Sequence, residues 1–170
     1  MITNEQLAGI LLCGGSSRRM GRAKYQLQLR GETLLQRICR IVKPEVCRIL
    51  IVAAADQEIP RTESNLEVLR DEFPEAGLLA GVSLALSYLQ TSEAETVAAF
   101  VASCDVPLPK PAVISLMRTH LTDDFDAVVV RDGGFAWPLC AIYRITAANT
   151  AAGLLASGQR RAAALPENLR

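Results

Sequence analysis

Glycines, hydroxyl side chains and basic side chains follow one another directly after the first apolar run of the sequence. In chain order this stretch is Leu12, Cys13, Gly14, Gly15, Ser16, Ser17, Arg18, Arg19, Met20, Gly21, Arg22, Ala23 and Lys24. Glycines let backbone N–H groups approach an anion closely, and hydroxyl and basic side chains can donate hydrogen bonds to it. The stretch therefore indicates a phosphate-binding loop, although an exposed loop without a ligand would have a similar composition.

The glycine spacing excludes the two most familiar phosphate-binding patterns. Gly21 is followed by Arg22 rather than by the Lys-Ser/Thr pair of a P-loop. The glycines after the first apolar run also lack the G-x-G-x-x-G spacing of a dinucleotide-binding turn. A phosphate site in this loop therefore belongs to another class.

Apolar runs that are typical of buried strands alternate with helical patterns along the chain. The predicted strands cover residues 7–13, 48–53, 66–69, 97–102, 126–130 and 137–145. The predicted helices cover residues 33–42, 78–89, 111–121 and 146–155. This alternation predicts an α/β fold with a mostly parallel sheet that carries helices on both faces. No repeat or linker divides the sequence, so we expect a single domain over residues 1–170.

A second polar cluster follows the predicted strand at 97–102. Asp105 comes shortly after this strand, as Gly14 and Gly15 come after the first one. The carboxyl ends of parallel strands meet at one edge of a sheet, and ligands of such folds bind there. We therefore expect the two clusters to form one site.

The composition narrows the class of protein. Half of the 170 residues are hydrophobic, and 18 basic residues balance 18 acidic ones, which argues against a general nucleic-acid binder. No apolar stretch has the roughly 20 residues of a membrane span, and the first residues do not resemble a signal peptide. We therefore expect a protein that does not work on a membrane or on nucleic acid.

The cysteines and the single histidine give little sign of metal or nucleophilic chemistry. The five cysteines, Cys13, Cys39, Cys47, Cys104 and Cys140, never form a C-x-x-C pair, so we expect free thiols in a reducing cytoplasm. His120 falls late in a helical pattern, where a surface position is favoured over a catalytic one.

The stretch from Leu12 to Lys24 resembles the signature loop of nucleotidyltransferases, L-x-G-G-x-S-x-R-M-G-x-x-K. Four further segments resemble motifs of one family in that superfamily, the molybdenum cofactor guanylyltransferases. They are Gly77-Leu78-Leu79-Ala80-Gly81, Cys104-Asp105-Val106-Pro107, Trp137-Pro138-Leu139-Cys140-Ala141 and Gly158-Gln159-Arg160-Arg161, which resemble G-P-L-A-G, C-D-x-P, P-x-x-A and G-x-R-R. The resemblance implies a single-domain, three-layer α/β/α, Rossmann-like nucleotidyltransferase fold.

The resemblance also implies a reaction and a site. Molybdopterin phosphate would attack the α-phosphorus of GTP, which joins GMP to the pterin and releases pyrophosphate. The loop residues and Gly81 would bind GTP; Arg19, Lys24 and Asp105 would be catalytic, and Asp105 would also bind Mg²⁺. Asp71 would accept hydrogen bonds from N1–H and N2–H₂ of guanine, where cytosine presents an amine beside an acceptor nitrogen. A turn cap for Asp105 and a solvated acid for Asp71 are the structural alternatives.

The sequence departs from the family pattern in three places. Leu78 replaces the proline of G-P-L-A-G, and Val52-Ala53-Ala54 follows the second strand where an asparagine near the base is expected. The family's final strand and N-x-N-T-P-E-x-L segment are shortened, with Ala162 and Ala164 at the asparagine spacing before Pro166. We therefore expect ordinary GTP binding, and we separately expect a monomer or weak homo-oligomer. Acceptor binding would be weak, or completed by a second subunit or by the enzyme that delivers molybdopterin.

Other functions fit the same residues. A cytidylyltransferase that acts on the same pterin is one alternative. Such cytidylyltransferases tend to have the motifs A-A-G and D-Q-P, whereas this chain has Cys13-Gly14-Gly15 and Cys104-Asp105, which resemble the guanylyltransferases. A nucleotidyltransferase with another phosphate acceptor, or a nucleotide-binding relative with weakened catalysis, would share the loop and the fold. Trp137 could stack on a ligand, but packing is the commoner role of a lone tryptophan beside a strand.

Overall fold

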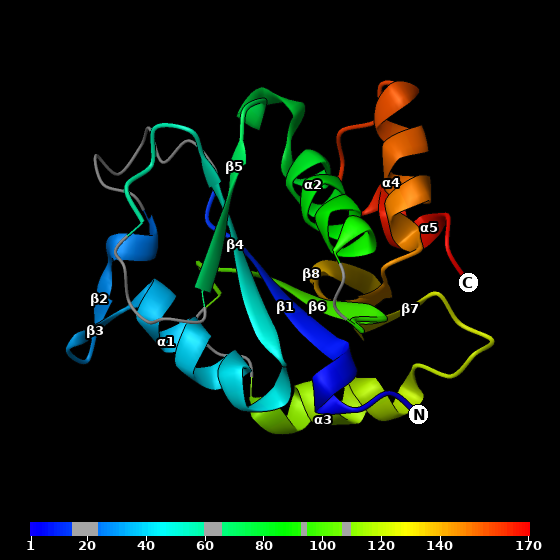
Figure 1. The fold of residues 1–170 in the computed structure, drawn as a ribbon, viewed down its shortest axis with the longest axis horizontal. Helices are drawn as coiled ribbons and strands as arrows, with labels where there is room; N and C mark the ends of the chain where they lie inside the picture. The colour runs from blue at the N-terminus through cyan, green and yellow to red at the C-terminus, as the bar shows by residue number, and fades with distance from the viewer. Residues whose placement is uncertain (15–23, 60–65, 93–94, 107–109) are drawn as a thin grey trace.

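A mostly parallel sheet lies at the centre of the molecule (Figure 1). The computed structural model describes residues 1–14, 24–59, 66–92, 95–106 and 110–170. The strands of this sheet are β1 (Leu7–Leu12), β4 (Arg48–Ala54), β5 (Leu66–Asp71), β6 (Ala98–Ser103), β7 (Ala127–Asp132) and β8 (Phe135–Arg144), in the order β5-β4-β1-β6-β8-β7. β1 pairs in parallel with β4 and β6, β4 pairs in parallel with β5, and β8 runs antiparallel to β6 and β7. The predicted α/β fold with a mostly parallel sheet is confirmed.

Helices cover both faces of this sheet (Figure 1). On one face lie α1 (Leu34–Val42) and α3 (Pro111–His120); on the other lie α2 (Leu78–Thr91), α4 (Ala147–Ala156) and α5 (Ala164–Glu167). A small hairpin of β2 (Gln28–Leu29) and β3 (Glu32–Thr33) precedes α1. Short 3₁₀ turns cover Asn4–Gln6, Lys24–Gln26, Lys43–Glu45 and Pro74–Ala76. The helices and the sheet form the three layers that the resemblance implies.

The central strands are buried on both faces, which explains their continuous apolar sequence. All six residues of β1 are buried. Leu11 packs in the core shared with α1 and α3, whereas Ile10 and Leu12 pack in the core shared with α2 and α4. Alternate residues of a strand point to opposite faces, so one apolar run supports two helical layers.

The predicted strands and helices agree with the observed ones to within two residues at each end. α1, for example, begins with a capping box: Thr33 Oγ1 accepts from the N–H of Gln36 at 3.1 Å, and Gln36 Oε1 accepts from the N–H of Thr33 at 2.9 Å. The sequence does not predict the β2–β3 hairpin or α5, because elements of two to four residues carry no periodic pattern.

The parallel strands bring several chain segments to one edge of the sheet, which we name the carboxyl edge. β5, β4, β1 and β6 run in the same direction, so their carboxyl ends share this edge. Asp71 ends β5, Cys13 follows β1, and Asp105 follows β6. The fold therefore places Cys13, where the predicted phosphate loop begins, between the two strands whose ends carry the predicted carboxylates.

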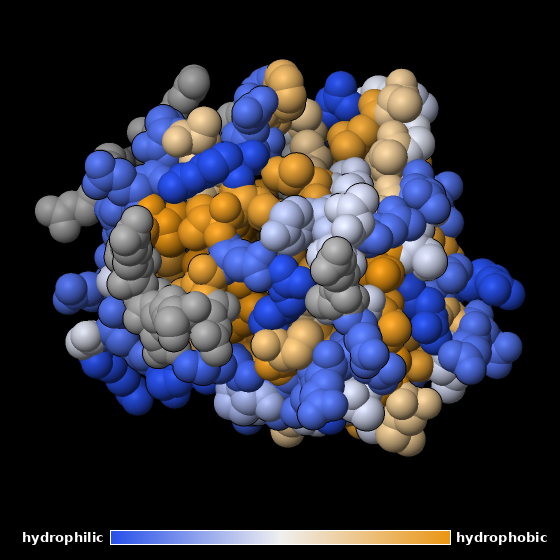
Figure 2. Space-filling model, in the orientation of Figure 1, coloured by the Kyte–Doolittle hydropathy of each residue, from blue (hydrophilic) through white to orange (hydrophobic). Residues whose placement is uncertain are grey.

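The surface beside β5 is apolar. β5 is an edge strand, Val68 on it is exposed, and Leu66 is only partly buried. Figure 2 shows apolar side chains at the surface over β4 and β5.

Within the described ranges, no helix combines the length and the apolar character that crossing a bilayer requires.

Candidate active site

Hydrogen bonds tie the residue after β1 to β4 and the residue after β6 to β1. The N–H of Cys13 donates to the carbonyl oxygen of Val52 at 2.8 Å, and the N–H of Cys104 donates to that of Leu12 at 3.1 Å. Both thiols are free and buried. Their mutual hydrogen bond, together with burial, raises the pKa of the Cys13 thiol. These contacts fix where the loop leaves β1 and where Asp105 follows β6.

An ion pair joins the end of the signature loop to the end of β6. Nζ of Lys24 lies 2.7 Å from Oδ2 of Asp105, although 81 positions separate the two residues. The side chain of Lys24 is 48% exposed and that of Asp105 is 33% exposed, so a ligand can reach both. The structure thus brings together two of the three predicted catalytic residues.

The surroundings of this pair keep both partners charged. Burial opposes the ionisation of Asp105, but hydrogen bonds from Lys24 and Ser103 outweigh it and hold the pKa of the carboxyl below its usual value. The same hydrogen bond to Asp105 raises the pKa of the Lys24 ammonium. At neutral pH the site therefore presents one fixed anion and one fixed cation.

Asp105 has the surroundings of a simple cation site. Its Oδ1 accepts a hydrogen bond from the hydroxyl of Ser103, and its Oδ2 carries the Lys24 ammonium. In the part of the chain that the structure describes, no cluster of three or more His, Cys, Asp or Glu side chains could hold a metal ion. Mg²⁺ usually binds one or two carboxylates together with substrate phosphates and water. A single carboxylate therefore fits a metal ion that arrives with a triphosphate.

Asp71 and Gly81 lie together where β5 ends and α2 begins. Oδ1 of Asp71 accepts a hydrogen bond from the N–H of Phe73 at 3.0 Å, which orients the carboxylate. A Cβ on Gly81 would lie 4.0 Å from Oδ2 of Asp71. It would also lie 3.3 Å from Leu12 and 3.4 Å from Val52. Gly81 therefore lets α2 approach the ends of β1 and β4 beside this carboxylate.

Gln57 braces the start of the loop, a role that its sequence context does not predict. Its Nε2 donates to the carbonyl oxygen of Cys13 at 3.1 Å, and its Oε1 accepts from the N–H of Ala54 at 2.8 Å. Arg70 in turn donates to the carbonyl oxygens of Gln57 and Ala54. An amide side chain is thus present just beyond the position where the family pattern suggests an asparagine. A glutamine in a polar loop carries no signal that would have identified it.

Two of the motif-like segments, 77–81 and 158–161, pack against each other. Gly77 precedes α2 with φ 83° and ψ −179°, a conformation almost restricted to glycine. A Cβ at this position would lie 3.0 Å from the carbonyl oxygen of Arg160. The Arg160 guanidinium donates to the carbonyl oxygen of Leu155 at 3.0 Å, near the end of α4. The segment after α4 therefore holds the start of the helix that carries Gly81.

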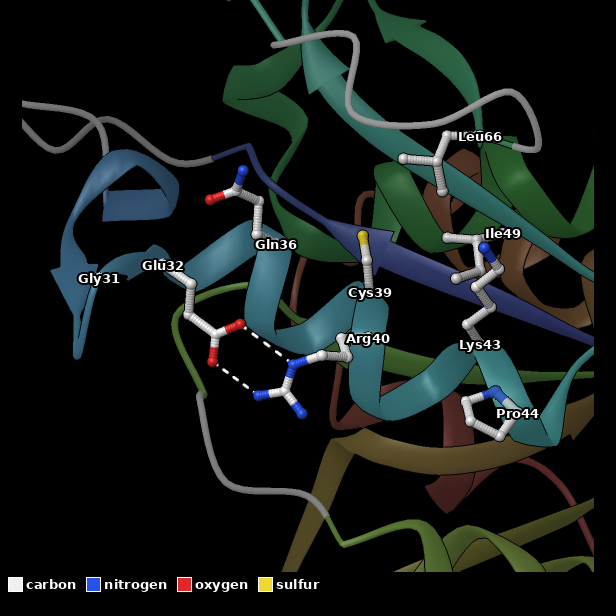
Figure 3. Close-up of a pocket in the computed structure, with 9 residues that line it drawn as sticks. All are labelled: Gly31, Glu32, Gln36, Cys39, Arg40, Lys43, Pro44, Ile49 and Leu66. Atoms are coloured by element: carbon white, nitrogen blue, oxygen red, sulfur yellow. Dashed lines mark hydrogen bonds and ion pairs between the residues drawn. The ribbon is translucent and has the colours of Figure 1, made fainter.

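Two pockets lie close to these elements without containing the Lys24–Asp105 pair. One, of about 570 Å³, is lined by Asp71, by α2 and by Leu155 of α4. The other, of about 690 Å³, lies along α1 (Figure 3). In Figure 3, Glu32 accepts two hydrogen bonds from Arg40, at 2.7 and 3.1 Å, so this pair ties the β2–β3 hairpin to α1.

The remaining predicted residues are placed as follows. Leu12 is buried at the end of β1, and a Cβ on Gly14 would have no atom of the described residues within 4 Å. His120 is the last residue of α3 and is exposed, which confirms its predicted surface position. The rest of the loop prediction lies outside the described residues, namely Gly15, Ser16, Ser17, Arg18, Arg19, Met20 and Gly21.

Three comparisons connect this site to known proteins. A protein of Opitutus terrae named as a molybdenum cofactor guanylyltransferase is 41% identical over 155 residues, which cover 91% of this chain and 74% of that protein. Molybdopterin-guanine dinucleotide biosynthesis protein A of Archaeoglobus fulgidus superposes with a TM-score of 0.76 at 23% identity, over 96% of this chain and 80% of that one. Rv0371c of Mycobacterium tuberculosis, solved in complex with manganese, has a TM-score of 0.62 at 14% identity, over 86% and 75%.

The structural similarities show a shared nucleotidyltransferase fold, and the sequence comparisons go further. The family model of the MobA-like NTP transferase domain matches residues 9–169, which include the signature loop, Asp71, Gly81 and Asp105. The resemblance that rests on the motifs is thereby confirmed, and the chain belongs to the family of MobA-like NTP transferase domains.

Proposed function

We propose that this chain transfers GMP from GTP to the phosphate of molybdopterin and releases pyrophosphate. The observation that carries the proposal is the contact between Lys24 and Asp105, which puts a cation and a carboxylate at the carboxyl edge beside the loop. Family membership and the name of the Opitutus terrae relative support the choice of reaction.

The reaction requires alignment and charge stabilisation rather than covalent chemistry by the protein. An oxygen of the acceptor phosphate bonds to the α-phosphorus of GTP. The bond from that phosphorus to the oxygen bridging to the β-phosphate breaks, and pyrophosphate leaves with the electron pair. Negative charge grows on the leaving group. Lys24, as a compact exposed cation, would stabilise that charge together with Arg19 of the loop.

Asp105 would hold Mg²⁺, with Ser103 keeping the carboxylate oriented. When bound, the ion supplies charge neutralisation at the phosphate oxygens. Lys24 occupies Oδ2 of this carboxylate, and its exposed side chain can turn from there toward a phosphate. The manganese complex of Rv0371c is consistent with a divalent cation in this fold.

Asp71 would select guanine. Its carboxylate is oriented by the N–H of Phe73 at Oδ1, and its Oδ2 lies on the side of Gly81. A carboxylate only accepts hydrogen bonds, so it matches the two adjacent donors of guanine and repels the acceptor edge of cytosine.

Pyrophosphate release tests the reaction. We expect release from GTP to require both molybdopterin and a divalent cation, to stop on chelation, and to return when Mg²⁺ is added. If GTP binds but releases no pyrophosphate with molybdopterin, the reaction is refuted, and another acceptor or a binding role replaces it.

A nucleotide panel tests the base. GTP should raise the unfolding temperature more than CTP, UTP or ATP, because stabilisation follows affinity. Asp71→Asn keeps an acceptor for the N–H of Phe73 but turns an amide donor toward the base, so the preference for GTP should disappear. If CTP protects the protein better than GTP, transfer of CMP from CTP replaces transfer of GMP as the proposed reaction.

A further inference from the structure

Two aromatic side chains are exposed next to each other on β8. Phe135 is 71% exposed and Trp137 is 50% exposed. Their ring centroids lie 6.3 Å apart with the planes tilted by 58°. Packing, the role that the sequence favours for Trp137, therefore accounts for only part of this residue, because half of it faces solvent beside a second ring. Large exposed aromatics that adjoin each other are typical of binding surfaces.

The strand register places this pair at the carboxyl edge. Ala102 of β6 pairs with Cys140 of the antiparallel β8. Because β8 is antiparallel to β6, the path backward along β8 from Cys140 to Trp137 leads toward the carboxyl edge. The path forward from Ala102 to Asp105 leads toward the same edge. On β7 a single residue step, from Val129 to Val130, spans the path from Ala141 to Trp137 on β8, so Trp137 lies about 3.3 Å beyond Ala141 along the sheet. The aromatic pair and Asp105 thus emerge at the same edge from neighbouring strands.

The pair also lies on the face of the sheet to which the chain crosses after Asp105. Trp137 pairs with Val130, and residues opposite each other in an antiparallel ladder share a face. Val130 packs against the core shared with α1 and α3, and α3 is the helix that follows Asp105. Tyr25, next to Lys24, is in the same core.

A bulge in β8 sets this position. Val129 and Val130 are adjacent on β7, but they pair with Ala141 and Trp137, so residues 138–140 bulge out of the ladder between β8 and β7. The hydroxyl of Tyr143 donates to the carbonyl oxygen of Pro138 at 2.9 Å inside this bulge. Bulges beside active sites commonly redirect a side chain, and the partly buried hydrogen bond from Tyr143 fixes this one. The exposed pair is therefore held in place by the core rather than by a loop.

The order of the strands divides the carboxyl edge between the two substrates. Asp71 ends β5 and Asp105 follows β6, three strand spacings away, which is about 14 Å. With the base at Asp71 and the phosphates at Lys24 and Asp105, the nucleotide covers the edge from β5 to β6. The next strand in the sheet is β8, which carries Trp137. An acceptor whose phosphate reaches Asp105 from the other side would lie over this strand.

We propose that Trp137 and Phe135 form the surface on which the planar ring system of the acceptor stacks. The proposal rests on the proposed function, in which that acceptor is molybdopterin. Stacking on an aromatic side chain tolerates many heterocycles, and removing one such contact weakens binding by about 5- to 100-fold. The rings bind and orient the acceptor, and they take no part in bond making.

Steady-state kinetics on three variants test the stacking surface. Trp137→Ala should raise the KM for molybdopterin by about 5- to 100-fold and leave the KM for GTP unchanged. Trp137→Phe keeps a ring and should restore most of the affinity. Phe125→Ala removes a similarly exposed ring, 49% exposed, at the far end of β7, and serves as the matched control with no effect. An unchanged KM for molybdopterin in Trp137→Ala would overturn the proposal.

Trp137 is the only tryptophan of the chain, so its fluorescence reports binding without turnover. Titration with pterin-6-carboxylic acid should quench the emission saturably, and Phe135→Ala should shift the midpoint to a higher concentration. Absence of quenching would contradict stacking even if GMP transfer is normal. Quenching without GMP transfer would keep the stacking surface and remove the proposed reaction, so the two failures are distinguishable. If the mass of the wild-type protein grows with concentration, and Trp137→Ala abolishes this growth without changing the KM, the pair is a protein contact and the proposal is wrong.

Discussion

Replacing Asp105 by asparagine should remove most of the turnover while leaving the fold almost as stable as before. The substitution keeps an oxygen that can accept from the Ser103 hydroxyl, but it removes the charge that faces Lys24. Loss of one preorganised electrostatic partner lowers the rate by about 10²- to 10³-fold, which corresponds to about 2.7–4 kcal/mol in the transition state.

The effect on stability should be much smaller, because the ion pair is half exposed. Two unit charges about 4 Å apart attract by roughly 1 kcal/mol in water and about 4 kcal/mol near a protein surface. Desolvation and the loss of side-chain freedom offset most of this, so exposed pairs contribute about 0–1 kcal/mol. With 48% of Lys24 and 33% of Asp105 exposed, we expect at most about 1 kcal/mol, or roughly 2–4 °C in unfolding temperature.

Pyrophosphate release at saturating GTP and molybdopterin, measured beside thermal unfolding, separates the two effects. Glu32→Gln is the control, because it weakens the ion pairs that tie Glu32 of the β2–β3 hairpin to Arg37 and Arg40 of α1, away from the site. The control should lose a similar amount of stability and keep its turnover. A folded Asp105→Asn protein that works at the wild-type rate would refute the role of this carboxylate, and so would an equal loss of turnover in Glu32→Gln.

The structure supports three further predictions. Gly77→Ala should destabilise the protein by about 1–3 kcal/mol in urea unfolding, because Gly77 has a positive φ and an added Cβ would lie 3.0 Å from the carbonyl oxygen of Arg160. The control Gly153→Ala, on the exposed face of α4, should stabilise the protein by about 0.5–1 kcal/mol. Equal effects of the two substitutions would contradict this reasoning. The stability difference between wild type and Asp105→Asn should be present above pH ~4 and vanish as the pH falls through the lowered pKa of Asp105, because only the ionised carboxylate pairs with Lys24; a difference that persists in acid would refute the ion pair as its cause. Tyr143→Phe should cost about 1 kcal/mol of stability, since it frees the carbonyl oxygen of Pro138, and should raise the KM for molybdopterin; a change in the KM for GTP instead would contradict the role of the bulge.

The fold could be predicted from the sequence because its central strands are buried on both faces. A run such as Leu7–Leu12 has to be apolar throughout when helices cover both sides of it, and such runs are easy to recognise. The β2–β3 hairpin was beyond prediction, because its strands have two residues each and its turn depends on Arg30 and Gly31 at positive φ. Backbone conformation, rather than side-chain pattern, determines that element.

The candidate site could be predicted in its residues but not in its contacts. The signature motif identifies Lys24 and the C-D-x-P motif identifies Asp105, yet only the folded chain shows that they touch across 81 positions. Gln57 and Ser103 escaped prediction because their residue types are common in turns and at strand ends, and only their hydrogen bonds distinguish them. Side chains that orient other groups leave little trace in a single sequence.

The exposure of the Lys24–Asp105 pair has a consequence for how the site can work. Before a nucleotide binds, the ammonium and the carboxylate neutralise each other across 2.7 Å. In the proposed reaction a triphosphate would need the ammonium and a divalent cation would need the carboxylate, so both partners would have to separate when the two bind. Separating a buried pair would cost about 3–5 kcal/mol of the binding energy, whereas separating this exposed pair costs about 1 kcal/mol or less. The pair therefore keeps both groups charged and in position at a small free-energy cost of separation. A larger residue nearby that buries the pair should raise this cost, so it should weaken GTP binding rather than strengthen it.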